Sequence, residues 1–240
     1  MRQALDLARE AQGLTSPNPA VGAVIVKDDK VVGTGFHMKA GSDHAEVVAI
    51  NDVLNNFPSA DESFFSDTEL YVTLEPCSHV GRTAACADLV IKVGIGRVYI
   101  GMLDPNPKVN GTGLANLKGA GVAVEVLDPQ SELANDVMLL NQAFIKAVSG
   151  DFPYVCLKSG ISLDGKIALD SGESKWITSE DSRSSARLER SMYDAVVVGS
   201  GTVIADNPEL AAHGKYADKG LFRVVIDNEL STPLDSDVYR

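Results

Sequence analysis

Hydrophobic positions in the first 150 residues alternate between helix-like and strand-like spacing. A short helix is predicted at the N-terminus, where the apolar residues Ala4, Leu5, Ala8 and Ala11 share one face. The apolar runs 21–26 and 31–36, joined by Asp28 and Asp29, have the pattern of a β-hairpin. Later spacing predicts helices over 44–55, 84–93, 114–118 and 133–148, and strands over 70–74, 97–101 and 122–126. Strands that alternate with helices after a hairpin indicate a mixed, mostly parallel sheet with helices on both faces.

A second alternation begins after the Gly-Asp-Phe-Pro sequence at 150–153. It predicts a helix over 179–192 and strands over 154–159, 195–199 and 223–227. We therefore expect two domains, 1–150 and 151–240. The second segment is short for a complete α/β domain.

Composition and charge narrow the functional classes. The chain has 240 residues, of which 45% are hydrophobic and 22% charged, as in soluble globular proteins. The net charge of −12 comes from an acidic excess on both sides of Gly150, which argues against general nucleic-acid binding but not against holding a single phosphate. No apolar stretch reaches the roughly 18–20 residues of a membrane span, and the N-terminus lacks a signal-peptide pattern, so we expect a cytoplasmic protein without a membrane partner. Three cysteines do not suggest a disulfide framework.

Candidate metal ligands occur at three separate places. His44 stands at a predicted helix start, Cys77 follows a predicted strand, and Cys86 follows nine positions later. One imidazole and two thiolates suit Zn²⁺, whose catalytic sites keep a fourth position for water. Glu46, two residues after His44, lies where it can reach that water. The order matches the His-x-Glu…Pro-Cys-x-x-Cys signature of zinc nucleobase deaminases, except that eight residues separate the cysteines.

These residues predict hydrolytic deamination. Zinc would lower the pKa of water to roughly 7 and supply hydroxide. Glu46 would accept a proton and return it to the ring nitrogen and then to the leaving amine. Two alternatives stay open: a structural zinc with His79 as fourth ligand, and cysteines that merely fill a core.

The loop between the cysteines contains two candidate ligand contacts. His79 and Arg82 are suited to bind a phosphate or a sugar hydroxyl. Asn18 and His37, on the two preceding loops, would complete a polar substrate site. The competing interpretation is that Asn18 shapes an Asn-Pro turn and His37 caps a strand.

Longer motifs resemble one enzyme family. Residues 16–22, 44–46 and 73–86 read SPNPAVG, HAE and TLEPCSHVGRTAAC. Together they resemble the bifunctional deaminase–reductase family of riboflavin biosynthesis, although Ala84 and Ala85 stand where prolines are usual. The motifs DPNP at 104–107, GTG at 111–113, KSGISLDGK at 158–166 and SGESKWIT at 171–178 fit the same family.

The resemblance implies a cytidine-deaminase-like three-layer α/β/α domain with a mixed sheet, followed by a dihydrofolate-reductase-like α/β domain. Family members continue beyond this C-terminus, so we expect either a truncated second domain or a defunct one, with weak or no turnover. The first domain would deaminate 2,5-diamino-6-(5-phosphoribosylamino)pyrimidin-4(3H)-one. The second would then reduce the ribose to ribitol with NADPH, and the enzyme would be a homo-oligomer.

The resemblance also assigns residues. Zinc ligands would be His44, Cys77 and Cys86, with Glu46 as the proton shuttle. Contacts to the substrate in the first domain would be Asn18, His37, His79 and Arg82. In the second domain, NADPH contacts would be Gly160, Trp176, Thr202 and Asp206, and substrate contacts Ser174, Arg190 and Leu210. His213 stands where the family tends to have a substrate-binding arginine.

Two other functions compete with this interpretation. A nucleoside or tRNA deaminase would use the same fold, but the acidic chain lacks the basic stripe that tRNA binding requires. A zinc-stabilised interaction module would have no activity. Ammonia release from the phosphorylated pyrimidine, but not from cytidine or tRNA, discriminates among the three.

Overall fold

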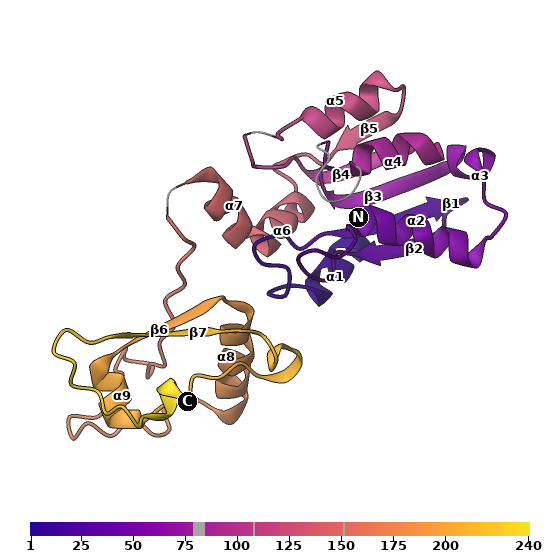
Figure 1. Cartoon of the computed structure of the whole chain (residues 1–240). Helices are drawn as coiled ribbons and strands as arrows, with labels where there is room; N and C mark the ends of the chain where they lie inside the picture. Colours follow the sequence, from indigo (N-terminus) through magenta and orange to yellow (C-terminus); the bar gives the residue numbers. More distant parts are fainter. Residues whose placement is uncertain (79–84, 108, 151) are drawn as a thin grey trace. The chain divides into compact units, whose positions relative to one another are not determined.

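The computed structural model describes residues 1–78, 85–107, 109–150 and 152–240 (Figure 1). The chain divides into two compact units, Met1–Tyr154 and Val155–Arg240. Within the described residues, no helix is both long and apolar enough to cross a membrane.

The first unit is built on a five-stranded sheet. Its strands in chain order are β1 (Gly22–Lys27), β2 (Lys30–Phe36), β3 (Thr68–Leu74), β4 (Arg97–Met102) and β5 (Ala123–Val126). Their order across the sheet is β2-β1-β3-β4-β5. The β3–β4 and β4–β5 pairs are parallel, whereas β1 is antiparallel to both β2 and β3. The predicted mixed sheet is confirmed, but it is not mostly parallel, because the hairpin joins it through an antiparallel pairing.

Helices cover both faces of this sheet (Figure 1). One face is covered by α1 (Arg2–Glu10) and α6 (Glu132–Leu140), which contact each other. The other is covered by α2 (Ala45–Asn56), α4 (Cys86–Val93) and α5 (Thr112–Gly119). This arrangement confirms the three-layer α/β/α fold. A short helix, α3 (Glu62–Ser66), precedes β3 and was not predicted.

The main core lies between the sheet and α2 with α4. It contains Ile25, Leu70, Val72, Val98 and Ile100 from the strands and Ala49, Ile50, Val53 and Val90 from the helices. Two glycines of β2 allow α2 to approach closely. A Cβ on Gly33 would lie 2.5 Å from the Ala49 carbonyl oxygen, and one on Gly35 would lie 2.3 Å from that of Ala45. The first turn of α2 is thereby held directly against the sheet.

The predicted helix over 133–148 is wrong as a single element. The structure has two helices, α6 and α7 (Gln142–Ser149), separated at Asn141. Asn141 leaves helical geometry, with φ −106° and ψ 16°, and its side chain bonds to the backbone of Ala20. This tertiary contact, which spacing along one segment does not reveal, accompanies the break.

The second unit contains a two-stranded parallel sheet, β6 (Ala195–Gly199) with β7 (Phe222–Ile226). Its helices are α8 (Glu180–Met192) and α9 (Ser200–Asp206), with 3₁₀ turns at Gly214–Tyr216 and Asp237–Tyr239. The predicted strand over 154–159 is wrong. Among the described residues this segment pairs with no strand, and its apolar residues Val155 and Leu157 are exposed.

Candidate metal centre and surrounding loops

Three elements of the first unit bring the predicted metal ligands together. His44 is the N-cap of α2, Cys77 follows the end of β3 by three residues, and Cys86 is the first residue of α4. Their ligand atoms all lie within 4.8 Å of one another. Residues distant in sequence therefore form one cluster, as their types and order predicted.

The cluster has the spacing of a zinc site. His44 Nδ1 lies 3.2 Å from Cys86 Sγ and 3.6 Å from Cys77 Sγ. With zinc bonds of about 2.3 Å to sulfur and about 2.0–2.1 Å to nitrogen, tetrahedral geometry places neighbouring sulfur and nitrogen ligands about 3.6 Å apart. The residues present therefore fit zinc with little movement, and three ligands leave one position of the tetrahedron for another group.

The local field favours a thiolate at Cys77. A hydrogen bond from the Cys86 side chain, together with those from His44 and the Cys86 backbone N–H, holds the pKa of Cys77 well below its ordinary value. The Cys86 N–H lies 3.3 Å from the Cys77 sulfur. Because zinc binds the thiolate form, this field prepares Cys77 as a ligand.

Glu46 occupies the first turn of α2 and is only 4% exposed. Burial raises the pKa of its carboxyl group to about 7. The carboxyl group also lies within hydrogen-bond range of the Cys86 thiol. A carboxyl group with a pKa close to ambient pH is suited both to accept and to return a proton. The structure thus places the predicted shuttle residue beside the metal ligands.

Asn18 and His37 also meet at this site. The His37 ring is buried, which lowers its pKa and favours the neutral form. His37 Nδ1 donates to the Asp43 carbonyl oxygen at 3.0 Å, so Nε2 is left to accept from the Asn18 amide at 3.1 Å. The ring meets that of His44 edge to face, with centroids 5.5 Å apart. The structure therefore brings Asn18, His37 and His44 into one cluster. His79 and Arg82 lie outside the described residues.

Glu75 has a role that the sequence interpretation missed. Its carboxylate is buried and accepts three backbone N–H groups, those of Asp104, Gly111 and Leu114, each at 3.0 Å. These bonds connect the end of β3 to the loop that follows β4 and to the start of α5. A Cβ on Gly113 would lie 2.0 Å from the Pro76 carbonyl oxygen, so α5 approaches this segment closely. The only sequence signals are Glu75 in the TLEPC motif and the GTG motif at 111–113.

In the second unit, the residues predicted for cofactor and substrate lie on several segments. Thr202 and Asp206 are on α9, whereas Gly160 and Ser174 lie outside helices and strands. Trp176 is 68% exposed, and the Arg183 guanidinium lies 4.1 Å from its ring centroid.

The segment 210–213 meets α8. Arg190 of α8 donates to the Ala211 carbonyl oxygen at 2.9 Å, and the His213 N–H donates to Ser191 Oγ at 2.8 Å. Leu210, in the same segment, has a φ of 55°. The structure therefore places the predicted substrate residues Arg190 and Leu210 in adjoining segments.

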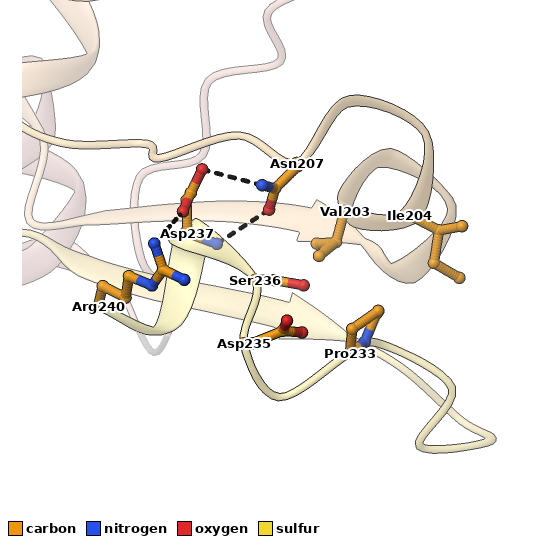
Figure 2. Close-up of a pocket in the computed structure, with 8 residues that line it drawn as sticks. All are labelled: Val203, Ile204, Asn207, Pro233, Asp235, Ser236, Asp237 and Arg240. Atoms are coloured by element: carbon orange, nitrogen blue, oxygen red, sulfur yellow. Dashed lines mark hydrogen bonds and ion pairs between the residues drawn. The ribbon is translucent and has the colours of Figure 1, made fainter.

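A cavity of about 320 Å³ is also present in this unit (Figure 2). It lies between α9 and residues 233–240, and Asn207 contacts Asp237 at its edge through two hydrogen bonds of 2.9 Å. Its lining includes Val203 and Ile204 but neither Thr202 nor Asp206. This cavity therefore does not coincide with the predicted cofactor residues.

Comparisons with known proteins agree with the sequence interpretation. Residues 1–102 match the family model "Cytidine and deoxycytidylate deaminase zinc-binding region", and residues 153–240 match "RibD C-terminal domain". The riboflavin biosynthesis protein RibD of Aquifex aeolicus is 43% identical over 99% of this chain and 64% of its own length.

Two solved structures are similar over nearly the whole chain. RibD of Acinetobacter baumannii has a TM-score of 0.84 at 41% identity, covering 99% of this chain and 65% of that one. A diaminohydroxyphosphoribosylaminopyrimidine deaminase/5-amino-6-(5-phosphoribosylamino)uracil reductase from Thermotoga maritima has a TM-score of 0.83 at 40% identity, covering 95% of this chain and 62% of that one. This chain thus spans less than two thirds of the length of these relatives. Residues 1–102 and 153–240 thus match a deaminase model and a RibD model, and nearly the whole chain is similar to RibD proteins of riboflavin biosynthesis.

Proposed function

We propose that the first unit hydrolytically deaminates 2,5-diamino-6-(5-phosphoribosylamino)pyrimidin-4(3H)-one, a step of riboflavin biosynthesis. The observation that carries this proposal is the His44–Cys77–Cys86 cluster with the buried carboxyl group of Glu46 beside it. The substrate class is the one on which the Thermotoga maritima relative, a diaminohydroxyphosphoribosylaminopyrimidine deaminase, acts.

His44, Cys77 and Cys86 would hold the zinc. When bound, zinc with an open fourth position makes water nucleophilic near neutral pH. Glu46 would accept one proton of that water and deliver it to the ring nitrogen, and would then pass the second proton, from the hydroxyl group now on the ring carbon, to the departing amine. The carbon–nitrogen bond then breaks, ammonia leaves, and the ring carbon becomes a carbonyl. Burial of Glu46 supports this role, because it brings the pKa into the range where transfer in both directions is favourable.

Asn18 and His37 would hold the pyrimidine and its ribose phosphate together with His79 and Arg82. The support is that Asn18 and His37 are hydrogen-bonded to each other and that the His37 ring contacts that of His44. The Asp43 carbonyl oxygen fixes His37 Nδ1 as a donor, and this orients Nε2 toward Asn18. A substrate group would therefore meet a preoriented pair.

The second unit would use NADPH to reduce the ribose of the deaminated product to ribitol. Gly160, Trp176, Thr202 and Asp206 would contact NADPH, and Ser174, Arg190 and Leu210 the substrate. Thr202 follows the carboxyl end of β6, the end at which open α/β sheets bind nucleotides, and Gly201 beside it has open space where a Cβ would lie. We also propose that the protein is cytoplasmic and forms a homo-oligomer. Light scattering, which measures the molar mass in solution, tests the oligomeric state.

A substrate panel tests the deaminase proposal. We expect the zinc-loaded protein to release ammonia from the phosphorylated diaminopyrimidine and not from cytidine or tRNA. Release from cytidine or tRNA would favour a nucleoside or tRNA deaminase. A zinc-loaded, folded protein that releases ammonia from none of them would favour the interaction module. NADPH oxidation with the deaminated product tests the second unit.

A further inference from the structure

We propose that Asn141 is a positioning residue that fixes the loop carrying Asn18 beside the metal centre. This inference rests on the proposed function, in which Asn18 contacts the substrate. Asn141 lies 121 residues from its partner in that loop, at the break between α6 and α7. It belongs to none of the motifs that indicate deamination.

One side chain satisfies both backbone groups of Ala20. Asn141 Oδ1 accepts from the Ala20 N–H at 2.8 Å, and Asn141 Nδ2 donates to the Ala20 carbonyl oxygen at 2.9 Å. Asn141 is 3% exposed and Ala20 is 4% exposed. Because buried backbone groups without partners are costly, removal of this amide would drive the loop toward another conformation.

The loop is irregular, and the Asn18 N–H donates within it to the Thr15 carbonyl oxygen at 2.8 Å. It connects α1 to β1 and contains no regular helix or strand between Ala11 and Val21. Asn18 lies two residues before Ala20, and Pro19 between them has a restricted φ, so displacement of Ala20 is transmitted to Asn18. Displacement of Asn18 would weaken its 3.1 Å contact with His37.

The metal ligands are held in a different way. They lie at the start of α2, after β3 and at the start of α4. Among the described residues, the hydrogen bonds of the Asn141 side chain go to Ala20 and to none of these ligands. Loss of Asn141 should therefore impair substrate binding and leave the metal in place.

The decisive variant is Asn141→Ala, with Asn135→Ala as its control, because Asn135 is an exposed residue of α6. We expect Asn141→Ala to raise KM for the phosphorylated diaminopyrimidine about tenfold, the effect of one misplaced hydrogen bond, with kcat changed less than about twofold. Zinc content should be unchanged, and hydrogen exchange in the peptide 15–21 should be faster. The control variant should match the unmodified protein in its kinetics, its zinc content and its hydrogen exchange.

A double-mutant cycle separates positioning from general support of the fold. If Asn141 acts through Asn18, Asn141→Ala should add little to KM when Asn18→Ala is already present. Additive effects on KM, loss of zinc or unchanged hydrogen exchange in 15–21 would overturn the proposal.

If Asn141→Ala does not fold, Asn141→Asp replaces it, because the aspartate keeps the acceptor for the Ala20 N–H. We then expect a smaller rise in KM and a smaller acceleration of hydrogen exchange. If the unmodified protein releases no ammonia, the proposed function fails, but the exchange comparison still decides whether Asn141 holds the loop.

Discussion

At the scale of single residues, Glu46 provides the sharpest test of the chemistry. A glutamine at this position keeps the volume but has no acid–base function. We expect Glu46→Gln to lower kcat for ammonia release by about 10²–10⁴-fold, the usual contribution of a general acid–base residue. Zinc content should stay the same, because Glu46 is not one of the three ligands. Kinetics and metal analysis on the same preparation measure both effects.

The matched control for this change is Glu132→Gln. Glu132 also lies in the first turn of a helix but is exposed and distant in sequence from the metal motifs. It should retain full activity. If Glu46→Gln is folded, zinc-loaded and as active as the control, Glu46 does not transfer the proton.

At the scale of elements, the buried carboxylate of Glu75 joins three segments around the site. Glu75→Ala would leave three backbone N–H groups without their acceptor, so we expect the free energy of unfolding to fall by about 3 kcal/mol. Glu75→Gln keeps one oxygen and should lose less. Glu125→Ala is the control, because its ion pair with Arg97 at 3.7 Å is exposed and contributes little. Urea unfolding of the three variants measures this, and equal loss for Glu75→Ala and Glu125→Ala would contradict it.

Elements whose signals are local were predictable from the sequence: hydrophobic spacing indicated the hairpin and the helix that follows His44. The metal cluster was predictable for another reason, because its residue types and their order form a recognisable signature. Tertiary contacts account for what was missed. The break at Asn141 accompanies its bonds to Ala20, and the role of Glu75 depends on N–H groups of a loop and of the first turn of α5, 29–39 residues away. The segment 154–159 has apolar residues but pairs with no strand in the part of the chain that the structure describes, so its composition alone was misleading.

At the scale of the whole molecule, the two units differ in how much apolar surface they bury. The first has an extended core of strand and helix residues, whereas the buried apolar residues of the second are Val203, Tyr216 and Val238. Alternate residues of β6 and β7, including Val197, Phe222, Val224 and Ile226, are exposed, although parallel sheets are normally covered on both faces. The second unit should therefore be the less stable one.

This difference predicts two unfolding transitions that respond differently to zinc. Trp176, the only tryptophan, lies in the second unit, so its fluorescence reports that unit alone, while far-ultraviolet circular dichroism reports both. We expect the fluorescence transition at the lower urea concentration. A second transition, at higher urea concentration, should be visible only by circular dichroism. Because all three metal ligands belong to the first unit, free zinc at about 100 times its Kd should stabilise that later transition by about 2.7 kcal/mol relative to chelator-treated protein. The fluorescence transition should not move, and a shift of both transitions by the same amount would show that the two units unfold together.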